Sequence, residues 1–329
     1  MLFIVGGLIA LFYYGKTLIM PLLVGAIIAI LVDIPVKKLN NLGLPKWLAI
    51  SLSILLTLIF FGLLFWLLSS QINTMAEDWP TIKEKSTQKL NSLSEWANSS
   101  LNWDYKDYLD NNKKIIQKAE GFAKSFLSSL ISLLSQSLII FVYVILFLIQ
   151  KRQFIVFFNR KFSNNTAINR LLVNASKITR NYFVGKGKIM LFLFAIYYLG
   201  FMVGSVPYAL FLALFAALFS IIPYLGNIIG GGVAVLLSYL YSGSTPALIV
   251  IGVVAATQLI ENYILTPWII GDEIDLSPFI TIFGVILFST LWGVVGAIIA
   301  LPLAGILKVI FEHTKHMEPY AFLMGKQDE

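Results

Sequence analysis

The sequence contains no cysteine and only two histidines in 329 residues. The absence of cysteine excludes disulfides, cysteine nucleophiles and thiolate metal sites, and it leaves the redox compartment undetermined. Gly230-Gly231-Gly232 has no strand-like run before it and no Lys-Ser/Thr after it, which argues against a phosphate loop and favours helix packing or a hinge. No nucleophile, base and acid form a recognisable set, so we predict no enzyme, no cofactor and no metal centre.

Charge is also scarce, because only 12% of the residues are charged while 58% are hydrophobic. Soluble chains are typically about 25% charged and about 45–50% apolar. Several uncharged runs reach the roughly 20 residues that a helix needs to cross a bilayer. The first residues lack a basic region and a small-residue cleavage site, so no cleavable signal peptide is predicted. The composition predicts an all-α, polytopic membrane protein whose surroundings are the lipid bilayer.

Basic residues are unevenly placed along this chain of formal net charge +7. Residues 151–188 contain nine Lys and Arg and no Asp or Glu, and the loop 35–46 contains three Lys and no acid. Loops that collect Lys and Arg lie in the cytoplasm, so both segments are expected there. Neither an aromatic ladder nor a nucleic-acid motif accompanies the charge, so no nucleic-acid partner is predicted.

Hydrophobicity and charge balance predict the remaining organisation. Residues 2–33 are too long for one span, and Tyr14-Gly15-Lys16 offers a break for a tight hairpin. Residues 47–70 are predicted to form one uninterrupted membrane span. The expected parts are N-terminal membrane helices (1–70), an extracytoplasmic helical segment (71–125), a span (126–150), a basic cytoplasmic segment (151–188), a transport core (189–312) and a cytoplasmic tail (313–329).

Residues 71–125 contain eight acids and eight bases, with apolar residues near helical spacing. This pattern predicts two amphipathic helices with a turn near 98–102, which pack on neighbours or on the membrane surface, or bind a ligand. The following span has Ser129, Ser132 and Gln136 on one face. Close helix packing through small residues and a transport pathway are the two interpretations of that stripe.

One polar group interrupts the apolar C-terminal half. Gln258, Glu261 and Asn262 are spaced to share a helical face. Burial of a carboxylate in a lipid-like setting costs free energy, so such a residue is interpreted first as part of a functional site. Glu261 could bind and release a proton or cation, with Gln258 and Asn262 beside it; alternatively, it lies at the interface or fixes helix packing through a hydrogen bond.

Two helix breaks complete the predicted substrate or ion site. Pro223, Gly226 and Asn227 form the first, and Thr266 and Pro267 form the second, where Pro267 is expected to end the helix. Such breaks expose backbone groups toward a cavity, although ordinary turns between spans would look the same. The other polar clusters are interpreted as solvated, not as metal sites: the turn with Asp272, Glu273 and Asp275, and the tail with Glu312, His313 and His316.

The final run, Pro278–Phe311, is longer than one crossing and could be divided at Trp292-Gly293 or at Gly296. This run shares a short sequence pattern with the earlier one, since Pro207 and Pro278 are each followed by Phe-Ser and then by a glycine break. An inverted repeat with broken helices would produce that pattern, and such helices line substrate sites in transporters.

Three ordered stretches resemble the AI-2E family of bacterial membrane proteins. They are Pro207 through the Ala/Leu/Phe run to Ile222-Pro223-Tyr224-Leu225-Gly226, then Gln258-x-x-Glu261-Asn262-x-x-Leu265-x-Pro267-x-x-x-Gly271, and then Leu276-Ser277-Pro278 through Gly293-x-x-Gly296-x-x-x-Ala300-Leu301-Pro302-Leu303-Ala304. The N-terminal layout agrees, so the resemblance covers nearly the whole chain, although the first span is short.

The resemblance implies about eight membrane helices in the bacterial cytoplasmic (inner) membrane, both termini inside, and homo-oligomers. Described members export the quorum-sensing signal autoinducer-2, and some are sodium(lithium)/proton antiporters. Strict alternation would leave the C-terminus outside, so agreement needs a re-entrant stretch, either Pro207–Tyr241 or Pro278–Phe311. We therefore expect a secondary transporter that exports a small polar metabolite, with a cation/proton antiporter or a partner-recruiting membrane protein as alternatives. A transporter should have a polar cavity at Glu261, whereas a scaffold should be packed shut there.

Overall fold

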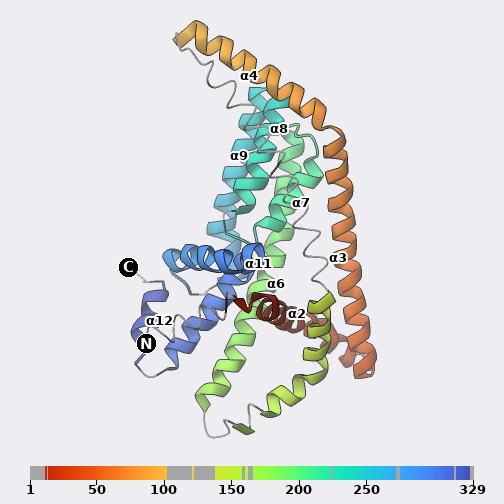
Figure 1. Cartoon of the computed structure of the whole chain (residues 1–329), viewed down its shortest axis with the longest axis vertical. Helices are drawn as coiled ribbons and strands as arrows, with labels where there is room; N and C mark the ends of the chain where they lie inside the picture. Colours follow the sequence, from red (N-terminus) through yellow and green to blue (C-terminus); the bar gives the residue numbers. More distant parts are fainter. Residues whose placement is uncertain are drawn as a thin grey trace.

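The chain folds into long helices, several of which run side by side (Figure 1). The structure, a computed structural model, describes residues 12, 14–101, 121, 138–157, 160–161, 166–223, 225–271, 275–314 and 316–326. Within these residues the elements are α2 (Lys16–Asn41), α3 (Lys46–Glu77), α4 (Trp79–Leu101), the helix Leu138–Phe157, α6 (Thr166–Val203), α7 (Ala209–Phe219), the π-helix η1 (Asn227–Gly231), α8 (Gly232–Ser242), α9 (Ser244–Ile260), the π-helix η2 (Glu261–Leu265), α10 (Thr266–Ile269), α11 (Pro278–Glu312) and α12 (Glu318–Met324).

Six helices in the described residues are long and apolar enough to cross a membrane. They lie in α2, α3, Leu138–Phe157, α6, the continuous run from α9 to α10, and α11. Large apolar side chains remain exposed on them, for example Phe60, Leu63 and Trp66 of α3. Exposed apolar surface of this kind fits a helix that faces lipid. The predicted all-α, polytopic membrane fold is confirmed.

Helix α6 forms the centre of the main core. Tyr182, Ile189, Leu193, Tyr197 and Phe201 are almost completely buried on it, and they pack with residues of α7, α8 and α9. This face repeats every three to four residues and is apolar on most of its length, as a core-facing helix requires. The core therefore surrounds the middle of α6, where the polar site described below is also found.

Helices α6 and α9 approach closely because Gly200 has no side chain. A Cβ atom at Gly200 would lie 2.3 Å and 2.7 Å from the two Cγ atoms of Val253 and 3.1 Å from its Cβ. Small residues spaced by four, here Gly200 and Gly204, are typical of membrane helices that pack closely.

We expect Gly200→Ala to lower thermal stability in detergent, by about 1–3 kcal/mol, because Val253 cannot rotate away from the new methyl group. Gly252→Ala is the matched control, since Gly252 lies in α9 and a Cβ there would meet no atom within 4 Å. The control should be neutral, or more stable by up to about 1 kcal/mol through helix propensity. Equal melting temperatures for the two variants would contradict the close α6–α9 contact.

Residues 209–242 form a helical hairpin that begins and ends at the same end of α6. Helix α7 has 11 residues and spans roughly 16 Å, about half of a 30 Å bilayer core. The return limb, η1 and α8, ends where Ser238 and Ser242 donate hydrogen bonds to the carbonyls of Gly204 and Ser205, at 2.8 Å and 3.1 Å. One of the two stretches expected to be re-entrant thus has hairpin geometry.

The glycines at the hairpin turn allow its limbs to touch. A Cβ at Gly226 would lie 2.3 Å from the Ala216 carbonyl oxygen, and one at Gly230 would lie 2.5 Å from the Ala216 Cβ. The predicted packing role of the Gly230-Gly231-Gly232 run is therefore confirmed for Gly230.

Helix α11 is also divided, as predicted from its length. Trp292 and Gly293 have non-helical backbone angles, with φ of −131° and +64°, and the two limbs run in different directions (Figure 1). The Trp292 indole N–H donates a hydrogen bond of 3.1 Å to the Phe12 carbonyl, and the two rings are 5.7 Å apart. The bend is thus anchored to the N-terminal part of the chain.

Helices extend beyond several of the bounds expected from the sequence. The loop expected at 35–46 is shorter, because α2 continues through Pro35 to Asn41. Burial of Val32 and Val36 against Ala49 outweighs the hydrogen bond that Pro35 removes. Helix α3 runs past residue 70 to Glu77, and α6 begins well before Ile189.

Other predictions fall partly outside the described residues. Helix α4 agrees with the first amphipathic helix, but it is still helical at 98–101 where the turn was expected. The second amphipathic helix and the stripe of Ser129, Ser132 and Gln136 lie outside the described residues. The predicted hairpin in 2–33 is described only from its second limb, which begins at Lys16 after Gly15.

Candidate functional site

A buried ion pair joins α6 to η2. Lys186 Nζ lies 2.7 Å from Glu261 Oε1, and the two side chains are 8% and 9% exposed. Lys186 is near the middle of the candidate span Asn174–Val203, and Glu261 lies within the candidate span Ser244–Ile269. An unpaired charge at such depth costs several kcal/mol, so ionisable groups inside membranes pair with each other. The buried carboxylate predicted at Glu261 is present, and its partner is a lysine.

The sequence interpretation had assigned Lys186 to the cytoplasmic anchors, which the structure contradicts. Lys186 was counted among nine bases of 151–188, yet it lies inside α6 with its side chain buried. Two signals could have identified it. Lys186 lies at the edge of the apolar run that begins at Ile189, and a buried acid such as Glu261 requires a cation from elsewhere in the chain.

The backbone at Glu261 is a π-helix, not the start of a break. The Thr266 N–H donates to the Glu261 carbonyl, five residues earlier. Pro267 has no N–H and would clash with the carbonyl four residues before it in a regular α-helix, and the wider turn accommodates it. Pro267 therefore does not end the helix as predicted; α10 continues to Ile269, and Gly271 turns the chain with a φ of +60°. Single π turns of this type are frequent at functional sites.

A chain of polar side chains connects α6, the hairpin and α9. The Tyr197 hydroxyl donates to Asn227 Oδ1, and Asn227 Nδ2 donates to Gln258 Oε1. Gln258 Nε2 then donates to Asn262 Oδ1 at 3.0 Å. Asn227 is the first residue of η1, so the hairpin contributes directly to this chain. The structure thus joins Asn227 to Gln258 and Asn262, which were predicted on a separate segment.

The shared face predicted for Glu261, Gln258 and Asn262 is only partly present. Glu261 is buried toward α6, whereas Asn262 is exposed. Gln258, partly buried, bonds to Asn262 and not to Glu261. Glu261 therefore pairs with Lys186, while the amide chain continues from Gln258 to Asn262.

The hairpin turn lies close to the ion pair. The Tyr182 hydroxyl of α6 donates a hydrogen bond of 3.2 Å to the Ile221 carbonyl in that turn. Of the remaining predicted residues, Pro223 and Gly226 lie in this turn, and Thr266 and Pro267 follow the carboxylate by about one helical turn.

The site is closed in this structure, because both charged side chains are more than nine-tenths buried. The polar cavity expected beside Glu261 is therefore not open among the described residues. The side chains do present both donors and acceptors in an apolar core, from Lys186, the tyrosines and the amide groups. Chemically, they can hold a proton, or bind a polar solute if the pair separates.

Asp275, in the acidic turn after α10, forms an ion pair with the C-terminal part of the chain. Lys308 lies 2.6 Å from Asp275 and 3.4 Å from Glu312. The hydrogen bond from Lys308 holds the pKa of the Asp275 carboxyl below its usual value. Asp272 and Glu273 lie outside the described residues. His313 and His316 are exposed, and the described residues contain no group of three His, Asp or Glu side chains that could hold a metal ion.

Long apolar helices, a hairpin too short to cross a bilayer and an ion pair inside the span region define a multi-pass membrane protein with an internal polar site. The chain belongs to the family described as "AI-2E family transporter", and the model of that family matches residues 2–316.

Curated relatives are similar over almost the whole chain. The chain is 27% identical over 319 residues to "Putative transport protein YueF" of Bacillus subtilis strain 168, a match that covers 90% of this chain and 84% of that protein. It is 24% identical over 310 residues to "Putative transport protein YhhT" of Escherichia coli strain K12, with 94% and 88% covered. It is 23% identical over 326 residues to "Putative permease PerM" of the same strain, with 93% and 90% covered. These similarities indicate a transport or permease function.

Proposed function

We propose that this chain is a secondary transporter that moves a small polar metabolite across the bacterial cytoplasmic membrane. Export is the direction that the family resemblance implies. The observation that carries the proposal is the ion pair of Lys186 and Glu261, which is buried within the candidate spans. A site packed shut was the expectation for a scaffold, and we interpret it as the closed state of a transporter, because buried ionisable residues are common on substrate and ion pathways.

The ion pair suits a gate that opens only when its charges are compensated. While the two groups are in contact they neutralise each other, so the closed state is stable in an apolar core. Separation leaves two buried charges unless a proton neutralises Glu261 or the polar groups of a solute replace the missing contact. Binding of proton or solute would thus be coupled to opening.

The hairpin is the element that we expect to move. It is anchored to α6 by polar contacts, through Tyr182 to Ile221 and through Tyr197 to Asn227. Discontinuous helices whose ends meet a site near the midplane are typical of secondary transporters. Displacement of the turn would break these contacts and expose Gln258 and Glu261.

Flux measurements in proteoliposomes with imposed proton and sodium gradients test this proposal, with candidate polar solutes assayed in turn. Glu261→Gln keeps the size of the side chain but removes its charge, and it should abolish solute flux. Because the variant leaves Lys186 buried without its partner, thermal unfolding in detergent is measured beside the flux to establish that the protein is folded. Glu77→Gln is the control, because Glu77 is exposed at the end of α3, and it should transport normally. Unchanged flux in Glu261→Gln would refute the role of the carboxylate. Cation exchange without any solute would instead support the antiporter alternative.

A further inference from the structure

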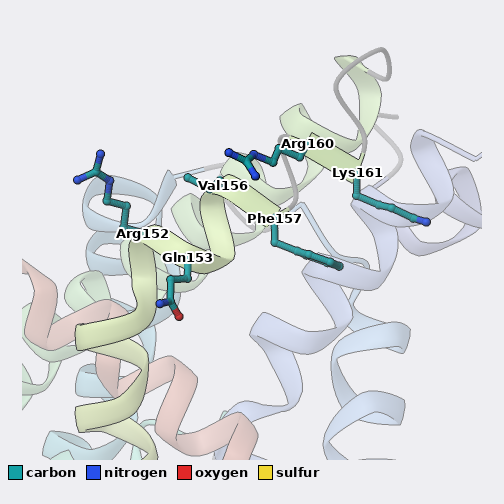
Figure 2. Close-up of a pocket in the computed structure, with 6 residues that line it drawn as sticks. All are labelled: Arg152, Gln153, Val156, Phe157, Arg160 and Lys161. Carbon is teal, nitrogen blue, oxygen red and sulfur yellow. The ribbon is translucent and has the colours of Figure 1, made fainter.

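An open cavity of about 650 Å³ lies at the basic end of the helix Leu138–Phe157. None of the residues that line this cavity belongs to the ion-pair site. The lining consists of three cations, one amide and two apolar side chains: Arg152, Gln153, Val156, Phe157, Arg160 and Lys161. Arg152 and Arg160 extend to one side of the ribbon, and Phe157 and Lys161 extend to the other (Figure 2). The lining contains no acidic group, so the cavity is strongly positive.

Among the described residues, no acid forms an ion pair with the three cations of this cavity, Arg152, Arg160 and Lys161. Lys151 differs, because it contacts Asp33 of α2 at 2.6 Å. The same Asp33 contacts Lys37 at 3.1 Å, so the cavity lies near the end of α2 that carries further lysines.

The cavity also lies at the end of a candidate membrane span, where a headgroup region is expected. The helix Leu138–Phe157 is a candidate membrane span, and its last four residues, Phe154 to Phe157, are 39–59% exposed. Exposed apolar residues therefore lie directly beside exposed cations. The charge of residues 151–188 predicts the cytoplasmic side for this end of the helix, and basic pockets on that side of membrane helices are suited to anionic lipid headgroups.

We propose that this cavity binds the phosphate of an anionic phospholipid, with Arg152 and Arg160, which extend to the same side of the ribbon, as donors. Arginine presents two parallel N–H groups to a phosphate, which gives stronger and more directional binding than a single ammonium. Val156 and Phe157 provide apolar surface for the first carbons of the acyl chains. A free phosphate shares the polar chemistry but leaves this apolar surface unused, so the lipid is the better fit.

Native mass spectrometry of the whole chain in detergent can test the site, with phosphatidylglycerol and phosphatidylcholine of identical acyl chains as probes. The unaltered protein should retain phosphatidylglycerol preferentially. The double variant Arg152→Gln/Arg160→Gln should weaken phosphatidylglycerol binding about tenfold or more, since each cation near an anionic surface contributes to the attraction. The control variant, Lys38→Gln/Lys46→Gln, removes two exposed cations outside the cavity and should change binding less than about twofold.

Three results would overturn this assignment. Equal retention of the two lipids would exclude headgroup recognition, and equal weakening in both double variants would reduce the effect to general surface charge. Displacement of phosphatidylglycerol by millimolar inorganic phosphate would show a free-phosphate site instead. A further variant, Arg152→Lys/Arg160→Lys, keeps the charge and should bind with intermediate strength, because it loses only the paired N–H geometry. Melting temperatures of all variants establish that each is folded.

Discussion

Lys186→Met is expected to abolish transport and to lower the stability of the protein by about 3–5 kcal/mol, because it leaves the Glu261 carboxylate buried without a partner. Methionine has nearly the volume of the lysine stem, so the loss reports on charge more than on packing. Thermal unfolding in detergent and solute flux in proteoliposomes are the two measurements. Lys188→Met is the control, because Lys188 is exposed two residues further along α6, and it should melt and transport like the unaltered protein.

The double variant Lys186→Met/Glu261→Gln separates stability from function. Replacement of both partners of a buried pair is often neutral or stabilising, whereas removal of one is costly. We therefore expect the double variant to regain most of the lost stability and to remain inactive in transport. A single variant Lys186→Met as stable as the unaltered protein would mean that the pair is not closed in the folded state. Transport by the double variant would mean that the charges are not needed.

The two residues of the buried ion pair differ in how readily the sequence identifies them. Glu261 is conspicuous because it is an isolated carboxylate in an apolar run. Lys186 is hidden because it follows seven other bases in a segment whose charge predicts cytoplasmic anchoring. The pair joins residues 75 positions apart, and no local pattern encodes that contact. Composition thus predicted the class and the acid, while only the tertiary structure identified the base.

The backbone conformation around the site was also not predictable from the sequence alone. Pro267 was interpreted as a helix break because proline removes a hydrogen bond. The structure keeps the helix by widening it into η2, where the Thr266 N–H reaches Glu261. The hairpin, by contrast, was expected as one of two re-entrant candidates from the family resemblance, and its turn was predicted from Pro223 and Gly226. Asn227 was predicted from that break, but its bond to Gln258 depends on how the hairpin packs against α9.

Gly296→Ala is expected to disrupt the bend of α11 and to lower the stability of the protein by about 3 kcal/mol or more, at the upper end of overpacking effects. A Cβ at Gly296 would lie 1.9 Å from the Phe288 carbonyl oxygen and 2.6 Å from its carbon. These are backbone atoms, which cannot rotate away as a side chain can. Thermal unfolding in detergent measures the effect.

Gly284→Ala provides a control in the same helix. The nearest atom to a Cβ at Gly284 is the Ala304 Cβ at 3.9 Å, an ordinary contact, so this variant should be neutral or slightly more stable. The comparison also distinguishes the bent α11 from a straight helix. In a straight helix residues 288 and 296 would be about 12 Å apart along the axis, and both alanine variants would then be tolerated equally. A large loss for Gly296→Ala alone therefore requires that the chain turn back between Phe288 and Gly296.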